Sequence, residues 1–273
     1  MANREHLALL QQGAVKWLEW RQKNIHIKPD LSEANLIETN LRGIDLSNTK
    51  LIAANFAKAN LSTANLYKAE LIDANLQQVE LIDAKLSETQ LMAADLSNAN
   101  LIGADLRGSN LRRADLSNAN LIATELGGAN LRECDLSAAN LRRTSLAYAN
   151  LMAANLSNAD LSDANLYEAE LIGAYLYRAD FHKANLSDAH LGGAYIFAAN
   201  FSEANLYRAD FRWANLSKVN FTGANLSKAN LRGANLSKAN FTGANLSQAN
   251  LDEANLSKAN FQGTIMPDGT IDF

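Results

Sequence analysis

The sequence contains little of what several protein classes depend on. Its 273 residues include one cysteine, Cys134, and two prolines. A single cysteine excludes an internal disulfide framework and fits a reducing compartment. The histidines are few and dispersed, with no spacing typical of a metal site, so we expect them on the surface. There are four of them, His6, His26, His182 and His190.

Long apolar runs and an excess of one charge are also missing. No apolar stretch approaches the length that spans a membrane, and no apolar segment typical of a signal peptide follows the first residues. The 29 acidic and 25 basic residues leave a net charge of −4. We therefore expect a cytoplasmic protein without direct nucleic-acid or membrane binding.

Recognisable catalytic motifs are absent as well. The sequence has no glycine-rich phosphate loop, no paired Cys or His spacing for a metal and no nucleophile motif. A core filled by Leu and Ala would leave no cavity for a substrate. The sequence thus predicts a protein that is not an enzyme, with no cofactor and no metal.

What the chain does contain is a five-residue repeat. Every fifth residue from Leu31 to Phe261 is Leu, Phe or Ile, which gives 47 consecutive centres. The residue two before each centre is usually Ala, and the one just before it is usually Asn or Asp. A period of five fits neither a helix nor a flat strand, so each unit needs a turn. The centre and the small residue share a spacing of two, which points both inward. Cys134 takes the small position, and we expect it to be buried.

The units Ala34-Asn35-Leu36 and Ala244-Asn245-Leu246 show the motif A-[DN]-L-x-x. The sequence resembles the pentapeptide-repeat proteins over residues 32 to 265. The resemblance implies an all-β fold, a right-handed quadrilateral parallel β-helix of about 12 coils of roughly 20 residues. The two ends of the chain are similar to those of cyanobacterial members that carry an N-terminal capping helix.

Three regions are expected. Residues 1–30 form a capping helix and a linker, residues 31–265 the β-helix, and residues 266–273 a C-terminal cap. One helix from residue 3 to about residue 24, with Asn3 as its N-cap, would dock its apolar stripe on the open first coil. A partner-binding or membrane-surface helix is the alternative, and the mixed charge of its polar face disfavours the membrane. At the other end, Met266, Ile271 and Phe273 either complete the cap or form an end-to-end dimer contact.

Outward positions twenty residues apart should stack into columns. In one column Tyr175 and Tyr195 replace the usual Asn or Asp, with Tyr177 and Phe197 beside them. These four aromatic residues should form one patch, either a partner or self-association site or a neutral ladder. Other columns are apolar or basic. The apolar columns either support the sheet by packing or form a protein-binding stripe, and the basic column reflects either repeat duplication or an anion-facing strip. They comprise Ile52, Ile72 and Met92; Ile82, Ile102 and Ile122; and Lys218, Lys238 and Lys258.

The pattern favours a rigid interaction scaffold whose protein partner the sequence does not identify, with a homodimer through one end or through the aromatic face as a further expectation. The alternative is a DNA-mimicking inhibitor or protector of DNA gyrase, since some members of the resembling family act so. A DNA mimic needs an excess of negative charge, because duplex DNA carries one charge per about 1.7 Å. Here the acidic residues are nearly balanced by basic ones, which disfavours mimicry.

Overall fold

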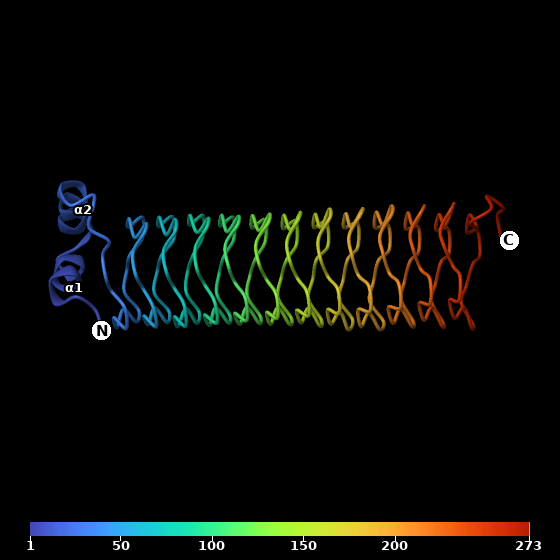
Figure 1. Cartoon of the computed structure of the whole chain (residues 1–273), viewed down its shortest axis with the longest axis horizontal. Coiled ribbons are helices and arrows are strands. Elements are labelled where there is room, and N and C mark those ends of the chain that lie inside the picture. The colour runs from blue at the N-terminus through green and yellow to red at the C-terminus, as the bar shows by residue number, and fades with distance from the viewer. Residues whose placement is uncertain (273) are drawn as a thin grey trace.

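The computed structural model describes residues 1–272 as a rod-shaped solenoid with two helices at its N-terminal end (Figure 1). Parallel β-bridges join residues twenty apart, as between Asn35 and Asn55 and then between Asn55 and Asn75. Each coil therefore takes twenty residues, or four pentapeptides. Within the described residues the β-structure of the coils consists of such single bridges, because a turn interrupts the extended backbone in every unit.

Backbone hydrogen bonds explain why each unit folds in the same way. In the unit around Phe56, the N–H groups of Phe56 and Lys58 donate to the next coil, and that of Asn55 donates to the preceding coil. The N–H of Ala59 closes the turn on the carbonyl of Phe56 at 2.8 Å. The side chain of Asn55 accepts the remaining N–H, that of Ala57, at 3.1 Å. Every N–H of the unit thus has a partner, and the Asn or Asp before the centre is what completes the set.

The second turn residue of each unit adopts a left-handed backbone. Lys58 has φ of 58° and Ala153 has φ of 55°, whereas Gly173 occupies the same position with φ of 66°. A positive φ at this position is what a type II turn requires, and it disfavours residues that carry a Cβ. The repeat accepts this local cost in most units because the inter-coil hydrogen bonds fix the turn from both sides.

The interior is a continuous core of centres and small residues. Leu136 is fully buried and Cys134 is 2% exposed, as the period of five predicts. Toward the C-terminus the centres of one column are aromatic, and neighbouring rings stack with centroids 4.6–5.6 Å apart. The members of this internal stack are Phe181, Phe201, Phe221, Phe241 and Phe261. Where a hydroxyl-bearing residue replaces the inward Ala, its hydroxyl hydrogen-bonds within the core. Thr144 Oγ1, for example, donates to the carbonyl of Leu121 at 2.7 Å.

The N-terminal segment forms two helices, so the prediction of a single helix is wrong. Helix α1 spans Arg4–Gln11 and α2 spans Ala14–Lys23. Gly13 separates them with φ of 103°, a conformation that an α-helix does not contain. The predicted N-cap is confirmed, because Asn3 accepts the N–H groups of the first turn at 2.9 and 3.2 Å.

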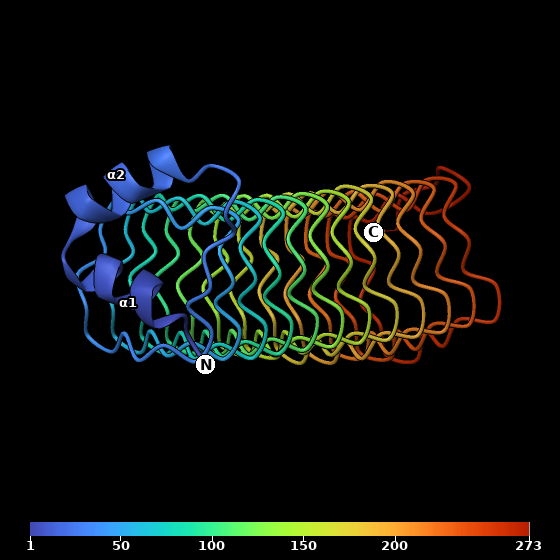
Figure 2. The same ribbon diagram turned by 60° about the vertical axis from the view of Figure 1, so that its left-hand side comes forward.

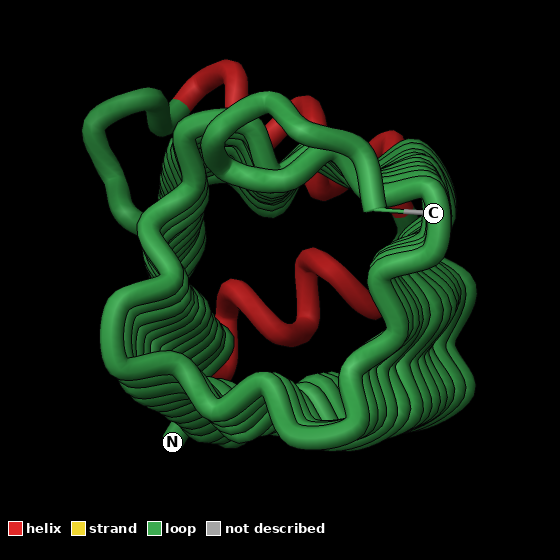
Figure 3. Tube along the Cα trace, turned by 90° about the vertical axis from the view of Figure 1, so that its right-hand side faces the viewer, coloured by secondary structure: helices red, strands yellow, loops and turns green. Residues whose placement is uncertain are grey.

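Both helices lie against the first coils (Figure 2), and α1 crosses the far end of the interior when the rod is viewed along its axis (Figure 3). Trp17 is fully buried, and its indole N–H donates to the carbonyl of Asp45 at 2.7 Å. His6 is 7% exposed, which corrects the expectation of a surface histidine. Its Nδ1 accepts the N–H of Asp30 at 3.0 Å, and its ring contacts Trp20. Neither helix is long and apolar enough to cross a membrane.

The C-terminal segment departs from the five-residue register. The chain turns back after Pro267, and Ile271 pairs with Ile265 in an antiparallel bridge. This returning segment covers the end of the rod incompletely, since Leu256 and Phe261 stay partly exposed. Their N–H groups, which donate to a following coil elsewhere, find no acceptor in residues 1–272. Of the residues expected in this contact, Phe273 lies outside the described residues.

Candidate protein-binding surface

The four aromatic residues of the candidate patch form two stacked pairs on the outside of the rod. Tyr175 and Tyr195 stack with centroids 5.0 Å apart and planes at 5°. Tyr177 and Phe197 stack at 6.0 Å and 6°. The one-coil separation of each pair sets this geometry, because equivalent residues of adjacent coils lie directly over one another. We call these four residues the aromatic ladder.

The ladder is open to solvent. The exposed fractions are 49% for Tyr175, 45% for Tyr177 and 55% for Tyr195. Each ring covers one face of its partner, and the ring edges and tyrosine hydroxyls are left at the surface. Ring edges carry partial positive charge, and hydroxyls donate hydrogen bonds. The exposed part of the ladder is therefore apolar in area but favours electronegative groups.

Replacing Asn by Tyr in this column also removes a backbone hydrogen bond. In the preceding coil the side chain of Asn155 accepts the N–H of Ser157 at 3.1 Å, and in the following coil Asn215 accepts that of Ser217 at 3.2 Å. A tyrosine side chain cannot make this short-range bond. The N–H groups of Tyr177 and Phe197 accordingly have no acceptor in the described part of the chain.

A hollow of about 390 Å³ lies beside the ladder, on the pentapeptides that come just before those of Tyr177 and Phe197 in the chain. It lies where Gly192 and Gly193 replace larger residues, between Ile172 of the preceding coil and Trp213 of the following coil. Trp213 is 62% exposed and packs over Gly233, where any Cβ would collide with the indole. This hollow was not predicted from the sequence. The adjacent glycines were its signal.

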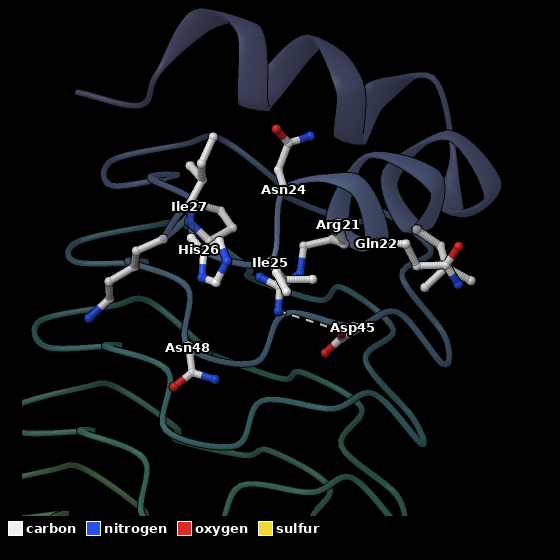
Figure 4. Close-up of a pocket in the computed structure, with 11 residues that line it drawn as sticks. Arg21, Gln22, Asn24, Ile25, His26, Ile27, Asp45 and Asn48 are labelled. Atoms are coloured by element: carbon white, nitrogen blue, oxygen red, sulfur yellow. Dashed lines mark hydrogen bonds and ion pairs between the residues drawn. The ribbon is translucent and has the colours of Figure 1, made fainter.

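A second hollow, of about 490 Å³, lies between α2, the linker and the first coils (Figure 4). Ile25 and Ile27 line it and are 75% and 48% exposed. Arg21 is held at its edge by bonds to the carbonyl and hydroxyl of Ser47 at 2.8 and 2.9 Å and by Asp45 at 3.5 Å. Its polar groups thus bind the cap to the rod rather than pointing into free space.

The other columns are less distinctive. The apolar columns pack side by side and are half-buried rather than exposed, which fits sheet packing. They contain Ile52, Ile72, Met92, Ile82, Ile102 and Ile122. The basic column of Lys218, Lys238 and Lys258 is exposed, and none of its ammonium groups has a carboxylate within 4.0 Å among residues 1–272.

The titratable groups with shifted pKa values are engaged in structural bonds. Burial raises the pKa of the Cys134 thiol to about 12, which keeps it protonated and unreactive at neutral pH. The bidentate guanidinium of Arg107 lowers the pKa of Asp105 to about 2. In the part of the chain that the structure describes, no three His, Cys, Asp or Glu side chains converge as a metal site would need.

Comparison with known proteins gives the family. The protein-family model described as pentapeptide repeats (8 copies) matches ten stretches of the sequence, which together run from residue 30 to residue 266. The comparison with curated proteins gave no match.

Several solved structures are similar. The crystal structure of HetL, a pentapeptide repeat protein involved in heterocyst differentiation regulation from the cyanobacterium Nostoc sp. strain PCC 7120, is 34% identical over 89% of this chain and 91% of that one, with a TM-score of 0.32. Rfr23 from the cyanobacterium Cyanothece 51142 is 30% identical over 51% of this chain and 86% of its own, with a TM-score of 0.25. QnrB1, a plasmid-mediated fluoroquinolone resistance protein, is 20% identical over 64% and 85%, with a TM-score of 0.46. The family match and the identity to HetL show that this chain belongs to the pentapeptide-repeat proteins.

Proposed function

We propose that this protein is a rigid, non-catalytic scaffold that binds a protein partner through the aromatic ladder. The observation that carries the proposal is the local exchange of Asn for Tyr at positions 175 and 195. This exchange gives up two backbone hydrogen bonds and exposes two stacked aromatic pairs. Lys50, Glu70, Glu80 and Gln90 leave the same N–H without an acceptor elsewhere in residues 1–272, so positions 175 and 195 are distinguished by the two exposed aromatic stacks that the exchange creates.

The body that carries the ladder is, in this proposal, a right-handed four-sided rod of about twelve coils. The twenty-residue spacing of the bridges and the repetition of four units per coil support that form. Such a rod presents its outward columns at fixed separations of about 4.8 Å, and no loop has to be ordered when a partner binds.

Gyrase-directed DNA mimicry is the competing function. QnrB1 acts in fluoroquinolone resistance, but at 20% identity it supports only a shared fold. The distribution of charge argues against mimicry, because residues 211–251 contain five basic residues and no acidic one. Two consecutive coils of that composition would repel a surface that binds DNA phosphates.

The test is to restore the consensus residue with Tyr175→Asn and Tyr195→Asn. We expect the double variant to fold with nearly unchanged stability, because two regained hydrogen bonds of about 0.5–1.5 kcal/mol each offset the lost aromatic stacking. Affinity capture from the native host should lose the partner that the unchanged protein retains. A matched control removes another aromatic pair on the outside of the rod, exposed Tyr148 and half-buried Tyr167, whose rings meet edge to face at 5.5 Å. The proposal fails if the ladder variant captures the same partners and keeps the same oligomeric state.

We also propose an end-to-end contact at the C-terminus, in which Met266 and Ile271 take part together with Phe273. Ile271 is 50% exposed, and the adjacent open N–H groups of the last coil offer further bonds to a second copy. Light scattering should show a dimer that Ile271→Asp converts to a monomer. Thr270→Asp, one residue away and also exposed, is the control for the added charge.

A further inference from the structure

Positive charge is concentrated just C-terminal to the aromatic ladder. Residues 211–251 contain five basic residues and no Asp or Glu, which leaves 20 basic and 29 acidic residues in the rest of the chain. The protein as a whole is acidic, whereas these two coils carry only positive charge. Charge on a rigid surface of this kind selects partners of the opposite sign.

Four exposed cations that make no ion pair in residues 1–272 fall into one column beside the ladder. Arg178, Lys218, Lys238 and Lys258 are all exposed, and none lies within 4.0 Å of a carboxylate in residues 1–272. The Lys218 ammonium lies 5.0 Å from the ring centre of Phe197, which connects the ladder to the lysines. The guanidinium of Arg178 lies 6.0 Å from the ring centre of Tyr177.

Two arginines on a neighbouring column differ, because they are already neutralised. Arg212 makes an ion pair with Asp210 at 2.6 Å, and Arg232 makes one with Glu253 at 2.7 Å. Lys228 makes no ion pair in residues 1–272 and donates to the hydroxyl of Tyr207 at 3.3 Å. The column of four cations, together with Lys228, is therefore the free part of the positive surface next to the ladder.

Backbone donors around the ladder point to the same chemistry. In the units whose Asn or Asp is replaced, the N–H groups of Ile172, Tyr177, Gly192 and Phe197 have no acceptor in the described chain. Carboxylate and carbonyl oxygens are the groups that pair with such donors. The hollow at Gly192 and Gly193 lies next to them and can accept an apolar side chain.

We propose that the partner segment is acidic and carries one apolar side chain. This inference rests on the proposed function and names the chemistry of its partner. The apolar side chain occupies the hollow between Ile172 and Trp213. The carboxylates of the segment face the ladder, its open N–H groups and the cations from Arg178 to Lys258.

An acidic protein segment fits this surface better than a nucleic acid. Sequence-tolerant binding of single strands stacks bases on exposed ring faces, and in each pair of the ladder the two inner ring faces are already occupied by each other. A long polyanion would also extend from the two basic coils onto the acidic remainder of the rod. A short acidic segment meets only the basic part.

The experiment measures fluorescence anisotropy with a labelled oligo-glutamate peptide that contains one central leucine. The full-length protein should bind it, and added salt should weaken the binding. Lys218→Gln, Lys238→Gln and Lys258→Gln together should weaken it about tenfold, since three exposed charge pairs are removed. A control with the same change of charge replaces Arg42, Lys85 and Arg143 by Gln, three exposed cations outside the column that also lack an ion pair in residues 1–272. It should bind within about twofold of the unchanged protein.

A second variant tests the hollow without removing charge. Gly192→Ile restores the residue type that Ile172 supplies one coil earlier, and a Cβ at Gly192 would lie 3.7 Å from its nearest neighbour, an ordinary contact. This variant should fold and should bind the leucine-containing peptide more weakly, while binding of an all-glutamate peptide is unchanged.

Three results would overturn the inference. They are the absence of peptide binding, an equal loss in the control variant, and tighter binding of an oligo-thymidylate that competes with the peptide. If any of them occurs while the variant with Asn at positions 175 and 195 still loses its captured partner, the scaffold proposal stands and only the acidic partner is wrong. If that variant keeps its partner, the scaffold proposal itself fails.

Discussion

A charge placed at a mid-rod centre tests the inward assignment of the repeat. Leu136 is fully buried, and Leu116 and Leu156, also fully buried, hold the equivalent positions in the adjacent coils. Replacing Leu136 by Asp puts a carboxyl group among these aliphatic side chains. Ala138, two residues further on, is exposed and provides the matched site for the same charge.

The expected loss of stability has two parts. The apolar burial of one leucine contributes about 1.5–3 kcal/mol, and an unpaired polar group inside costs roughly a further 1–3 kcal/mol. Leu136→Asp should therefore destabilise the fold by about 4 kcal/mol or more at neutral pH, whereas Ala138→Asp should change it by less than about 0.5 kcal/mol. Leu136→Asn supplies the polar group without a titrating charge.

The pH dependence separates the charge from the polarity. Burial raises the folded-state pKa of the new carboxyl group above its unfolded value of about 3.9. Its penalty is therefore smallest below about pH 4 and grows as the pH rises toward the folded-state pKa. The deficit of Leu136→Asp relative to the unchanged protein should widen over this range, while that of Leu136→Asn should stay constant.

Urea denaturation followed by circular dichroism at several pH values measures these differences. Limited proteolysis should in addition place the first cleavages near residue 136, because a solenoid opens where neighbouring coils lose contact. If Leu136→Asp melts like the unchanged protein, its side chain cannot be inside, and the inward assignment is refuted.

The remaining predictions concern single interactions. Thr144→Val should cost about 1 kcal/mol in urea denaturation, because the hydroxyl bonded to Leu121 is lost and the carbonyl stays buried; no loss would mean that this bond contributes nothing net. Gly173→Ala should cost about 1–2 kcal/mol through its positive φ alone, since nothing lies within 4 Å of the added Cβ, and an unchanged midpoint would contradict that strain. Arg107→Gln should raise the pKa of Asp105 from about 2 toward 3.8, as followed by NMR. Because the pKa of Asp105 is depressed in the folded state, its ion pair with Arg107 stabilises the fold above pH 3.8, and this contribution is lost as the pH falls toward 2. In Arg107→Gln the free energy of unfolding should therefore change less with pH over that range.

The period of five, together with the family resemblance that it carries, was sufficient to predict a repeat solenoid with the centres inside. The spacing between Cys134 and Leu136 puts both side chains inward, and the structure confirms their burial. The stacking of Tyr175 on Tyr195 follows from the twenty-residue coil in the same way. The break at Gly13 was also readable, since glycine disfavours the middle of a helix, but the apolar spacing on both sides concealed it.

Only the tertiary structure decided which hydrogen-bonding and charged groups have a partner. The burial of His6 depends on where α1 meets the N–H of Asp30, a contact that no local pattern encodes. The charge of residues 211–251 is visible in the sequence, yet it takes the positions of neighbouring carboxylates to show that Lys218 is free and Arg212 is paired. Local periodicity determines the direction of a side chain, whereas the pairing of donors and charges depends on distances between coils. The candidate binding surface rests on those distances.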